Sequence, residues 1–287
     1  MTKSYVASLQ AAGIKVLFSL GGADSGLPNG TVDFDQVLQM AKSPTQFQTD
    51  LVASIQQTIS QYGFDGVDFD IEDGFTGQGT IDKPTGDVAV LANVINTLHQ
   101  NNSKLLISLV PQVDNIAATS GFGNPWASYS SLIMQTSPAI SWVGIQLYNT
   151  GCADGIDDVC YANNGLSQDF SVAMATDLLE NWPAKDPYGR DTGFQHYINY
   201  LRPDQVVLGY PSTNSQGGSN ALPVTANGLI MQAIQCLRTG KSCGQYTPPD
   251  LYPTIGGVFN WEVTYDADNH FQFANQLKNC VLKGNCT

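Results

Sequence analysis

The stretch that decides the fold of this 287-residue chain is Phe64-Asp65-Gly66-Val67-Asp68-Phe69-Asp70-Ile71-Glu72. Apolar and acidic residues alternate along it, which is typical of a β-strand whose two faces differ. One face carries the carboxylates of Asp68, Asp70 and Glu72, each about 6–7 Å from the next along the strand. The other face is aliphatic and aromatic, so it is suited to packing under helices.

An ordinary half-exposed strand with its acids in water is the alternative interpretation of this stretch. No Lys or Arg lies within it, and a glycine lies close to each end, at Gly63 and Gly74. Strands flanked by helices in α/β folds are also buried on both faces. Because buried acids are costly to desolvate unless they share protons or meet a ligand, the stretch favours a functional site.

Composition limits what the chain can be. With 42% hydrophobic residues, 287 residues can bury one large core, as one α/β barrel or as two smaller domains. The net charge of −13 and the pI of about 4.3 disfavour nucleic acid and anionic membranes as partners. No apolar run is long enough to span a bilayer. We expect a monomer that acts on a neutral or cationic ligand.

Six cysteines fall in three close pairs, which are Cys152 with Cys160, Cys236 with Cys243, and Cys280 with Cys286. An even count at short spacing predicts three local disulfides and a secreted, extracellular protein. Buried free thiols are the alternative. Residues 1–10 lack the apolar core of a signal peptide, so secretion would imply a mature or truncated chain.

Strand patterns alternate with helix patterns along the chain, which predicts a parallel βα architecture. The expected strands are residues 15–20, 64–72, 105–111, 140–147, 206–211 and 255–262. The expected helices are residues 4–12, 44–61, 87–101, 129–135, 171–181, 193–201, 229–237 and 269–283, with loops at 73–86 and 151–165. A doubly wound open sheet is the alternative, but no glycine-rich phosphate-binding fingerprint opens the chain.

Polar and aromatic residues gather where the expected strands end, at Glu72, Gln112, Tyr148, Asn149 and Trp261. A parallel (β/α)8 barrel places its active site at that face. A second motif, Ser19-Leu20-Gly21-Gly22, ends the first strand, and its paired glycines permit a tight turn and close approach of the backbone.

The acidic stretch resembles the D-G-x-D-x-D-x-E signature of family 18 glycoside hydrolases, the chitinases, at all four acids and the glycine. The segment Ser19-Leu20-Gly21-Gly22 resembles the S-x-G-G motif of that family, and Gln146-Leu147-Tyr148-Asn149 resembles the ending of its sixth strand. The likeness extends from residue 12 to about residue 274. It implies an α/β fold of the (β/α)8 TIM-barrel type, as a single catalytic domain over residues 1–287.

The strand count differs from that family. In family 18 the S-x-G-G strand is the third and the acidic strand is the fourth, so this chain with six expected strands lacks the first two. A fragment, a wrong gene start and a reduced barrel all remain open as explanations. An open barrel would expose two strand edges and its core, which costs stability and invites association.

The resemblance assigns a role to each matched residue. Glu72 would be the general acid, Asp70 would share a proton beside it and stabilise positive charge, and Asp68 would lie deeper in the barrel. Tyr148 would hold the acetamido group of the substrate. The expected substrate-binding residues are Gln112, Gln146, Asn149, Trp261 and Gly22. Trp261 would form the floor under the sugar and precede a cis peptide to Glu262. Two structural alternatives remain open. Trp261 could be plain core, and Tyr148 could donate a hydrogen bond to a buried carbonyl.

These roles imply substrate-assisted hydrolysis. Family 18 uses the N-acetyl oxygen of its own substrate in place of a second carboxylate nucleophile. Asp70 and Tyr148 would hold that group in line for attack. We therefore expect net retention through an oxazolinium intermediate, with no metal and no cofactor.

Several functions remain open. The first is an endo-acting chitinase that binds chitin or chitooligosaccharide, and an endo-β-N-acetylglucosaminidase acting on N-glycans needs the same acids. A non-catalytic carbohydrate-binding barrel is less favoured because Glu72 is intact. A metal-dependent hydrolase would use Asp68, Asp70 and Glu72 as ligands to Mg²⁺ or Ca²⁺. Zinc is disfavoured because none of His99, His196 and His270 joins a ligand-like spacing.

Overall fold

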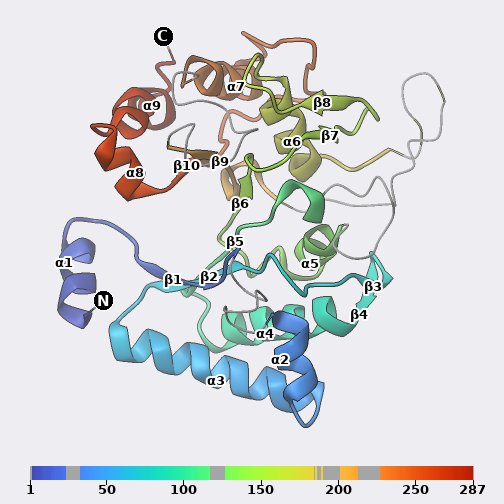
Figure 1. The fold of residues 1–287 in the computed structure, drawn as a ribbon, viewed down its shortest axis with the longest axis vertical. Helices are drawn as coiled ribbons and strands as arrows, with labels where there is room; N and C mark the ends of the chain where they lie inside the picture. Colours follow the sequence, from blue (N-terminus) through green and yellow to red (C-terminus); the bar gives the residue numbers. More distant parts are fainter. Residues whose placement is uncertain are drawn as a thin grey trace. The chain divides into compact units, whose positions relative to one another are not determined.

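The computed structural model describes residues 2–23, 33–116, 127–183, 185, 189, 201–212 and 227–286 (Figure 1). Its contacts divide the chain into two compact units. Unit 1 comprises Met1–Pro111 and Phe122–Val143, and unit 2 comprises Gln112–Gly121 and Gly144–Thr287. Each unit has its own buried core. The single catalytic domain expected over residues 1–287 stays a prediction.

Unit 1 alternates helices with parallel strands (Figure 1). Its elements are α1 (Lys3–Ala11), β1 (Leu17–Gly21), α2 (Phe34–Met40), α3 (Pro44–Tyr62), β2 (Gly66–Asp70), β3 (Gln78–Thr80), β4 (Lys83–Thr85), α4 (Gly86–Asn101), β5 (Leu106–Leu109), α5 (Ser128–Thr136) and the start of β6 (Trp142–Gln146). Helix α4 packs against α3 on one side and against α5 on the other.

Helix α3 illustrates how local sequence sets these elements. The Ser43 hydroxyl caps its N-terminus, and Pro44 takes the first helical position, where a missing N–H costs little. Gly63 ends the helix in the left-handed conformation, with φ of 77°. The side chains that α3 buries are Phe47, Val52 and Ile55.

The acidic strand lies at the centre of unit 1. Strand β2 pairs in parallel with β1 on one side and with β5 on the other. The register places Val67 beside Ile107 and Phe69 beside Leu109, and all four side chains are fully buried. The apolar face expected for this strand is therefore confirmed as part of the core.

Unit 2 continues β6 from residue 144. Its other elements are the 3₁₀ turn η1 (Val113–Asn115), β7 (Cys152–Asp154), β8 (Cys160–Ala162), α6 (Asp169–Leu179), the 3₁₀ turn η2 (Pro203–Gln205), β9 (Val206–Pro211), α7 (Asn227–Thr239), β10 (Gly257–Trp261), α8 (Val263–Asp268) and α9 (Gln272–Lys283). The strand order of the main sheet is β1-β2-β5-β6-β9-β10. The six strands expected from the sequence are thus confirmed as an α/β fold, and closure into a barrel stays a prediction.

Two expected loops contain short antiparallel hairpins. Residues 73–86 include the pair β3–β4, and residues 151–165 include the pair β7–β8. Helix α2 was also not predicted. The predicted helix at residues 193–201 lies outside the described residues, apart from Leu201.

The closing helix expected over residues 269–283 is shorter than predicted. It begins at Gln272, because His270 and Phe271 have positive φ of 57° and 56° and break it from α8. The buried Asp266 then accepts hydrogen bonds from the Phe273 and Ala274 N–H groups and caps α9. The break is therefore stabilised by a side chain that belongs to the preceding helix.

The three predicted disulfides are present, and the alternative of free thiols is wrong. Their Cα–Cα distances are 5.6 Å for Cys152–Cys160, 4.9 Å for Cys236–Cys243 and 4.1 Å for Cys280–Cys286. Secretion itself stays a prediction. Among the helices that the structure describes, none combines the length and apolar character needed to cross a bilayer.

Candidate active site

Along the acidic strand, buried apolar residues alternate with less buried acids, as the sequence pattern predicts. Along β2 and the two residues that follow it, Val67, Phe69 and Ile71 are buried. The residues Asp68, Asp70 and Glu72 are half-buried. The strand therefore keeps three acids partly accessible over an apolar base.

Asp68 is held between two serine hydroxyls. The register places Ser19 of β1 and Ser108 of β5 on either side of it. The Ser19 hydroxyl donates to Asp68 Oδ2 at 2.8 Å, and the Ser108 hydroxyl donates to Asp68 Oδ1 at 2.5 Å. Burial raises the pKa of the Asp68 carboxyl, and the two hydroxyl donors offset this only in part. Asp68 is thus fixed in orientation and costly to ionise.

Tyr129 of α5 holds the end of the strand between Asp70 and Glu72. Its hydroxyl accepts a hydrogen bond from the Ile71 N–H at 2.8 Å, and carbonyl oxygens of Phe69 and Ile71 each lie 3.3 Å away as acceptors. Tyr129 is fully buried. Burial raises its pKa well above the ordinary value, and the charges of the three strand acids add to this effect. The phenol therefore remains protonated.

The paired glycines lie directly against the strand. A Cβ on Gly21 would lie 2.0 Å from the Asp70 carbonyl oxygen, so no larger residue fits without a backbone shift. The Gly22 N–H donates to that same carbonyl at 2.6 Å. The close approach expected of this motif is confirmed, and Gly22 contacts the backbone of an acidic residue.

Asp65, the first acid of the motif, links elements together. Its carboxylate accepts hydrogen bonds from the Val16 N–H and from Gln10, both at 2.9 Å, and it pairs with Lys15 at 3.2 Å. Burial acts to raise the pKa of Asp65, but the bonds from Val16, Gln10 and Lys15 outweigh it and lower the pKa. This acid therefore joins β2 to α1 and to the segment that precedes β1.

The remaining predicted site residues belong to unit 2. Gln112 and Gln146 form an isolated parallel bridge, with Gln146 buried and Gln112 half-buried. Tyr148 is also buried, and the exposed Asn149 has a left-handed backbone with φ of 55°. The structure thus brings the two glutamine segments together at the end of β6.

Trp261 ends β10 with 48% of its surface exposed, so the alternative that it is plain core is wrong. The peptide bond to Glu262 is cis, as the resemblance implies. Ser212 holds this peptide, since its N–H donates to the Trp261 carbonyl at 2.8 Å and its hydroxyl donates to the Glu262 carbonyl at 2.9 Å. The side-chain amide of Asn260 donates to the same hydroxyl at 2.7 Å.

Three residues that position the acids, Ser19, Ser108 and Tyr129, were not predicted from the sequence. Ser19 carried a signal, because it lies inside the Ser19–Gly22 motif, and Ser108 did too, as the only polar residue of the apolar run 105–111. No feature of the sequence indicated a positioning role for Tyr129. Asn260 and Ser212, which hold the Trp261–Glu262 segment, were not predicted either. Among the described residues, no group of three or more His, Cys, Asp and Glu side chains is arranged to hold a metal ion.

The chain resembles known proteins over nearly all of its length. A curated relative, chitinase D of Niallia circulans, is 30% identical over 283 residues, which cover 95% of this chain and 50% of the relative. The chain therefore spans about half the length of the curated relatives it matches.

Two solved structures are similar to it. The C-terminal domain of Legionella pneumophila ChiA is 59% identical with a TM-score of 0.94, covering all of this chain and 86% of that one. A family GH18 chitinase from Chromobacterium violaceum is 26% identical with a TM-score of 0.73, covering 96% of this chain and 67% of that one. These neighbours imply a TIM-type fold. The family model for glycosyl hydrolases family 18 matches residues 3–281, and the chain belongs to that family.

Proposed function

We propose that this protein is a chitinase that cleaves β-1,4 linkages between N-acetylglucosamine units within a chitin chain. The observation that carries the proposal is the acidic strand of unit 1. It holds Asp68 between two serine hydroxyls and has its end fixed by Tyr129 between Asp70 and Glu72. Membership of family 18 and relatives named as chitinases support the choice of substrate.

We assign Glu72 the role of general acid and then general base. Cleavage of a glycosidic bond needs a proton on the leaving oxygen and a partner for an oxocarbenium-like carbon. Glu72 follows the last residue of β2 by two positions, where Tyr129 fixes the backbone. A carboxyl on a rigid strand end meets the need of a proton donor for a defined position.

Asp70 is assigned the stabilisation of the positive charge and of the acetamido group of the substrate. Asp70 shares a proton with Glu72, and Asp68 is assigned the deeper position beneath them. The raised pKa of Asp68 supports this deeper position, because burial makes its carboxyl costly to ionise. Attack by the acetamide oxygen from the substrate itself gives net retention, without a second carboxylate nucleophile.

Tyr148 is assigned the holding of the acetamido group, and Trp261 the floor under the sugar. The exposed indole supports the second assignment, because an accessible aromatic face suits the apolar face of a sugar ring. Gln112, Gln146, Asn149 and Gly22 remain proposed substrate-binding residues.

Three disulfides support a secreted enzyme, and a monomer stays part of the proposal.

The Glu72→Gln variant tests the proposal. It removes the transferable proton and keeps the shape, so turnover of soluble chitooligosaccharide should fall about 10²- to 10⁴-fold while oligosaccharide binding persists. Glu180→Gln is a matched control, because Glu180 is bonded to Tyr252 and can be replaced by another acceptor. A Glu72→Gln enzyme that cleaves at the wild-type rate would show that the acid is wrongly assigned.

The same site residues are compatible with two alternative functions. An endo-β-N-acetylglucosaminidase would release N-glycans and leave chitooligosaccharides uncut. A non-catalytic binding protein would retain chitooligosaccharides without cleaving them. Side-by-side product analysis with both substrates separates the three functions.

A further inference from the structure

The segment that follows β6 carries two of the proposed site residues, Tyr148 and Asn149. Tyr148 is buried, and the exposed Asn149 has a left-handed backbone with φ of 55°. Left-handed backbone is uncommon outside glycine and persists where neighbouring groups hold it. The Leu147 N–H donates to the Gly209 carbonyl at 3.0 Å, which ties the start of the segment to β9. The turn beyond Leu147 needs a further anchor.

Asn163 supplies this anchor. Its side-chain amide nitrogen donates to the Leu147 carbonyl and to the Thr150 carbonyl, both at 3.4 Å. Its backbone N–H donates to the Gly151 carbonyl at 3.2 Å. One residue therefore binds three carbonyls of the stretch 147–151 and spans the turn that carries the two site residues.

The carbonyls fix the orientation of the Asn163 side chain. A carbonyl oxygen can only accept, so the amide nitrogen faces both of them and the amide oxygen faces away. Asn163 is only 4% exposed, and its Oδ1 has no hydrogen-bond partner among the described residues. A buried acceptor without a partner lowers stability. Keeping both donor bonds at this cost favours a role in function over a role in folding alone.

The β7–β8 hairpin brings Asn163 to this position. Its register pairs Cys152 with Ala162, so the next residues outward, Gly151 and Asn163, lie side by side at the base of the hairpin. The Cys152–Cys160 disulfide closes the same hairpin. The place of Asn163 beside the turn therefore follows from the register of a covalently closed element.

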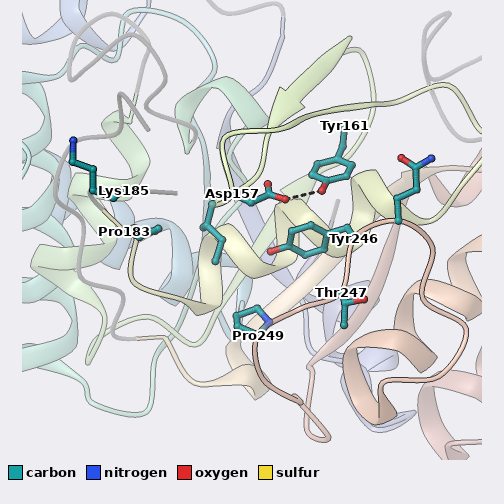
Figure 2. A pocket seen from close by; sticks show the side chains of 9 residues that line it. Asp157, Tyr161, Pro183, Lys185, Tyr246, Thr247 and Pro249 are labelled. Carbon is teal, nitrogen blue, oxygen red and sulfur yellow. Dashed lines mark hydrogen bonds between the residues drawn. The ribbon is translucent and has the colours of Figure 1, made fainter. Parts of the chain in front are cut away.

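The hairpin is itself held in place. The Tyr161 hydroxyl donates to Asp157 Oδ2 at 2.8 Å within the hairpin (Figure 2). The Tyr161 ring packs edge-to-face on Tyr246, with centroids 5.1 Å apart, and both hairpin strands pack against α6. A site supported by rigid elements is more precise than one supported by loops. Asn163 is thus an anchor that can hold its neighbours to a defined position.

We propose that Asn163 is a positioning residue, which holds the turn after β6 so that Tyr148 meets the acetamido group of the substrate in line for attack. Asn163 is buried and acts through Tyr148, without touching the substrate. The proposal rests on the proposed function, which assigns the acetamido group to Tyr148. A misplacement of about 1 Å can reduce turnover about 100-fold, so a modest loosening of the turn is enough.

Asn163→Asp is the first test. It keeps the shape of the side chain and replaces the donor nitrogen with a carboxylate oxygen that cannot donate. With chitotetraose as substrate, kcat should fall about 10- to 100-fold, while KM changes less than about threefold. Asn163→Ala removes both side-chain bonds without adding an acid and should give a fall at least as large. Unchanged kcat in both variants overturns the proposal.

Asn164→Asp is the matched control. It makes the same change of charge at the next residue, which is exposed. The Asn164 Oδ1 accepts from the Leu166 N–H at 3.0 Å, and an aspartate at this position retains that bond. Its kcat and KM should equal those of the parent. An equal loss in Asn164→Asp contradicts a specific role for Asn163.

A double-mutant cycle separates positioning from general destabilisation. If Asn163 acts through Tyr148, Asn163→Asp should have little further effect on kcat once Tyr148→Phe has removed the hydroxyl. A loss that depends on the presence of this hydroxyl supports the proposal. The same loss in the Tyr148→Phe and parent backgrounds overturns it.

A measurement without substrate separates this proposal from the proposed function. In ¹⁵N relaxation, the backbone order parameters of Tyr148 and Asn149 should fall from about 0.85 in the parent toward about 0.6 in Asn163→Asp. Unchanged order parameters refute the anchor whatever the activity. Absence of chitotetraose hydrolysis in the parent, together with this loss of order, refutes the chitinase assignment and supports the anchor.

Discussion

The hydroxyl of Tyr129 accepts a hydrogen bond from the backbone N–H of Ile71 at 2.8 Å, across a sequence separation of 58 residues. Ile71 stands between Asp70 and Glu72, so a side chain at the start of α5 fixes the backbone that carries both acids. The contact joins helix packing to the candidate chemistry, because α5 cannot move without shifting the end of the strand.

Tyr129→Phe should therefore impair both stability and turnover. It leaves the buried Ile71 N–H without an acceptor, which costs about 1–3 kcal/mol of unfolding free energy. We expect kcat to fall about tenfold or more, with a smaller change in KM, because the proton donor loses its fixed position. Urea unfolding and steady-state kinetics measure the two effects. Tyr62→Phe, at a half-buried ring in the same unit, is the control. Equal kcat in the Tyr129→Phe and parent enzymes refutes the positioning role.

Gly21→Ala tests the close approach of β1 to the acidic strand. The added Cβ would lie 2.0 Å from the Asp70 carbonyl oxygen, and φ of 108° disfavours any residue with a Cβ. Resolving a clash with backbone should destabilise unit 1 by about 2 kcal/mol or more. Gly13→Ala, with positive φ but no neighbour within 4 Å of the added Cβ, provides the control for backbone strain alone. Thermal unfolding of the two variants compares these costs, and equal losses would contradict the clash.

Asp68→Asn should stabilise the protein near neutral pH and reduce its activity. Burial raises the folded-state pKa of Asp68 above its ordinary value of 3.8. The favourable contribution of Asp68 to the free energy of unfolding is therefore fully present below its ordinary pKa of 3.8, and it is lost as the pH rises through the folded-state pKa. The stability difference between variant and wild type should grow from pH 4 to pH 7. Melting curves across this range that show the opposite trend would refute the desolvation argument.

Asp65→Asn should have the opposite pH dependence. The pKa of Asp65 is lowered in the folded state, so its contribution is present above the ordinary value of 3.8 and lost as the pH falls through the folded-state pKa. At pH 7 the substitution should cost about 1.5–3 kcal/mol, the range for hydrogen bonds to a charged group. Lys15→Met should cost less than about 1 kcal/mol, because Lys15 is 68% exposed and the ion pair is screened. Unfolding at pH 7 and pH 3 checks both statements.

Chelation discriminates the glycosidase from a metal-dependent hydrolase. In the proposed mechanism every proton and charge is handled by protein and substrate groups, so EDTA treatment followed by desalting should leave chitooligosaccharide hydrolysis unchanged. A loss of activity that Mg²⁺ or Ca²⁺ restores would favour the strand acids as metal ligands.

The sequence by itself determined the six strands of the sheet, the two-faced acidic strand, the pairing of the cysteines and the family. These features are local. Alternation at period two separates Val67, Phe69 and Ile71 from the acids, and the three cysteine pairs are separated by only 6 to 8 residues. Patterns within one element or between near neighbours in the chain are enough to predict the strands and the cysteine pairs, and short motifs carried the resemblance to the family.

Only the tertiary structure decided what surrounds the acids. Ser19 and Ser108 bond to Asp68 from 49 and 40 residues away, and Tyr129 reaches Ile71 from 58. Such contacts depend on strand register and helix packing, which no local pattern encodes. The hairpins β3–β4 and β7–β8 were not predicted, because strands of three residues are too short to show an alternation of apolar and polar residues. The structure likewise assigned Asp65 to the joining of elements, because its partners lie on other segments of the chain.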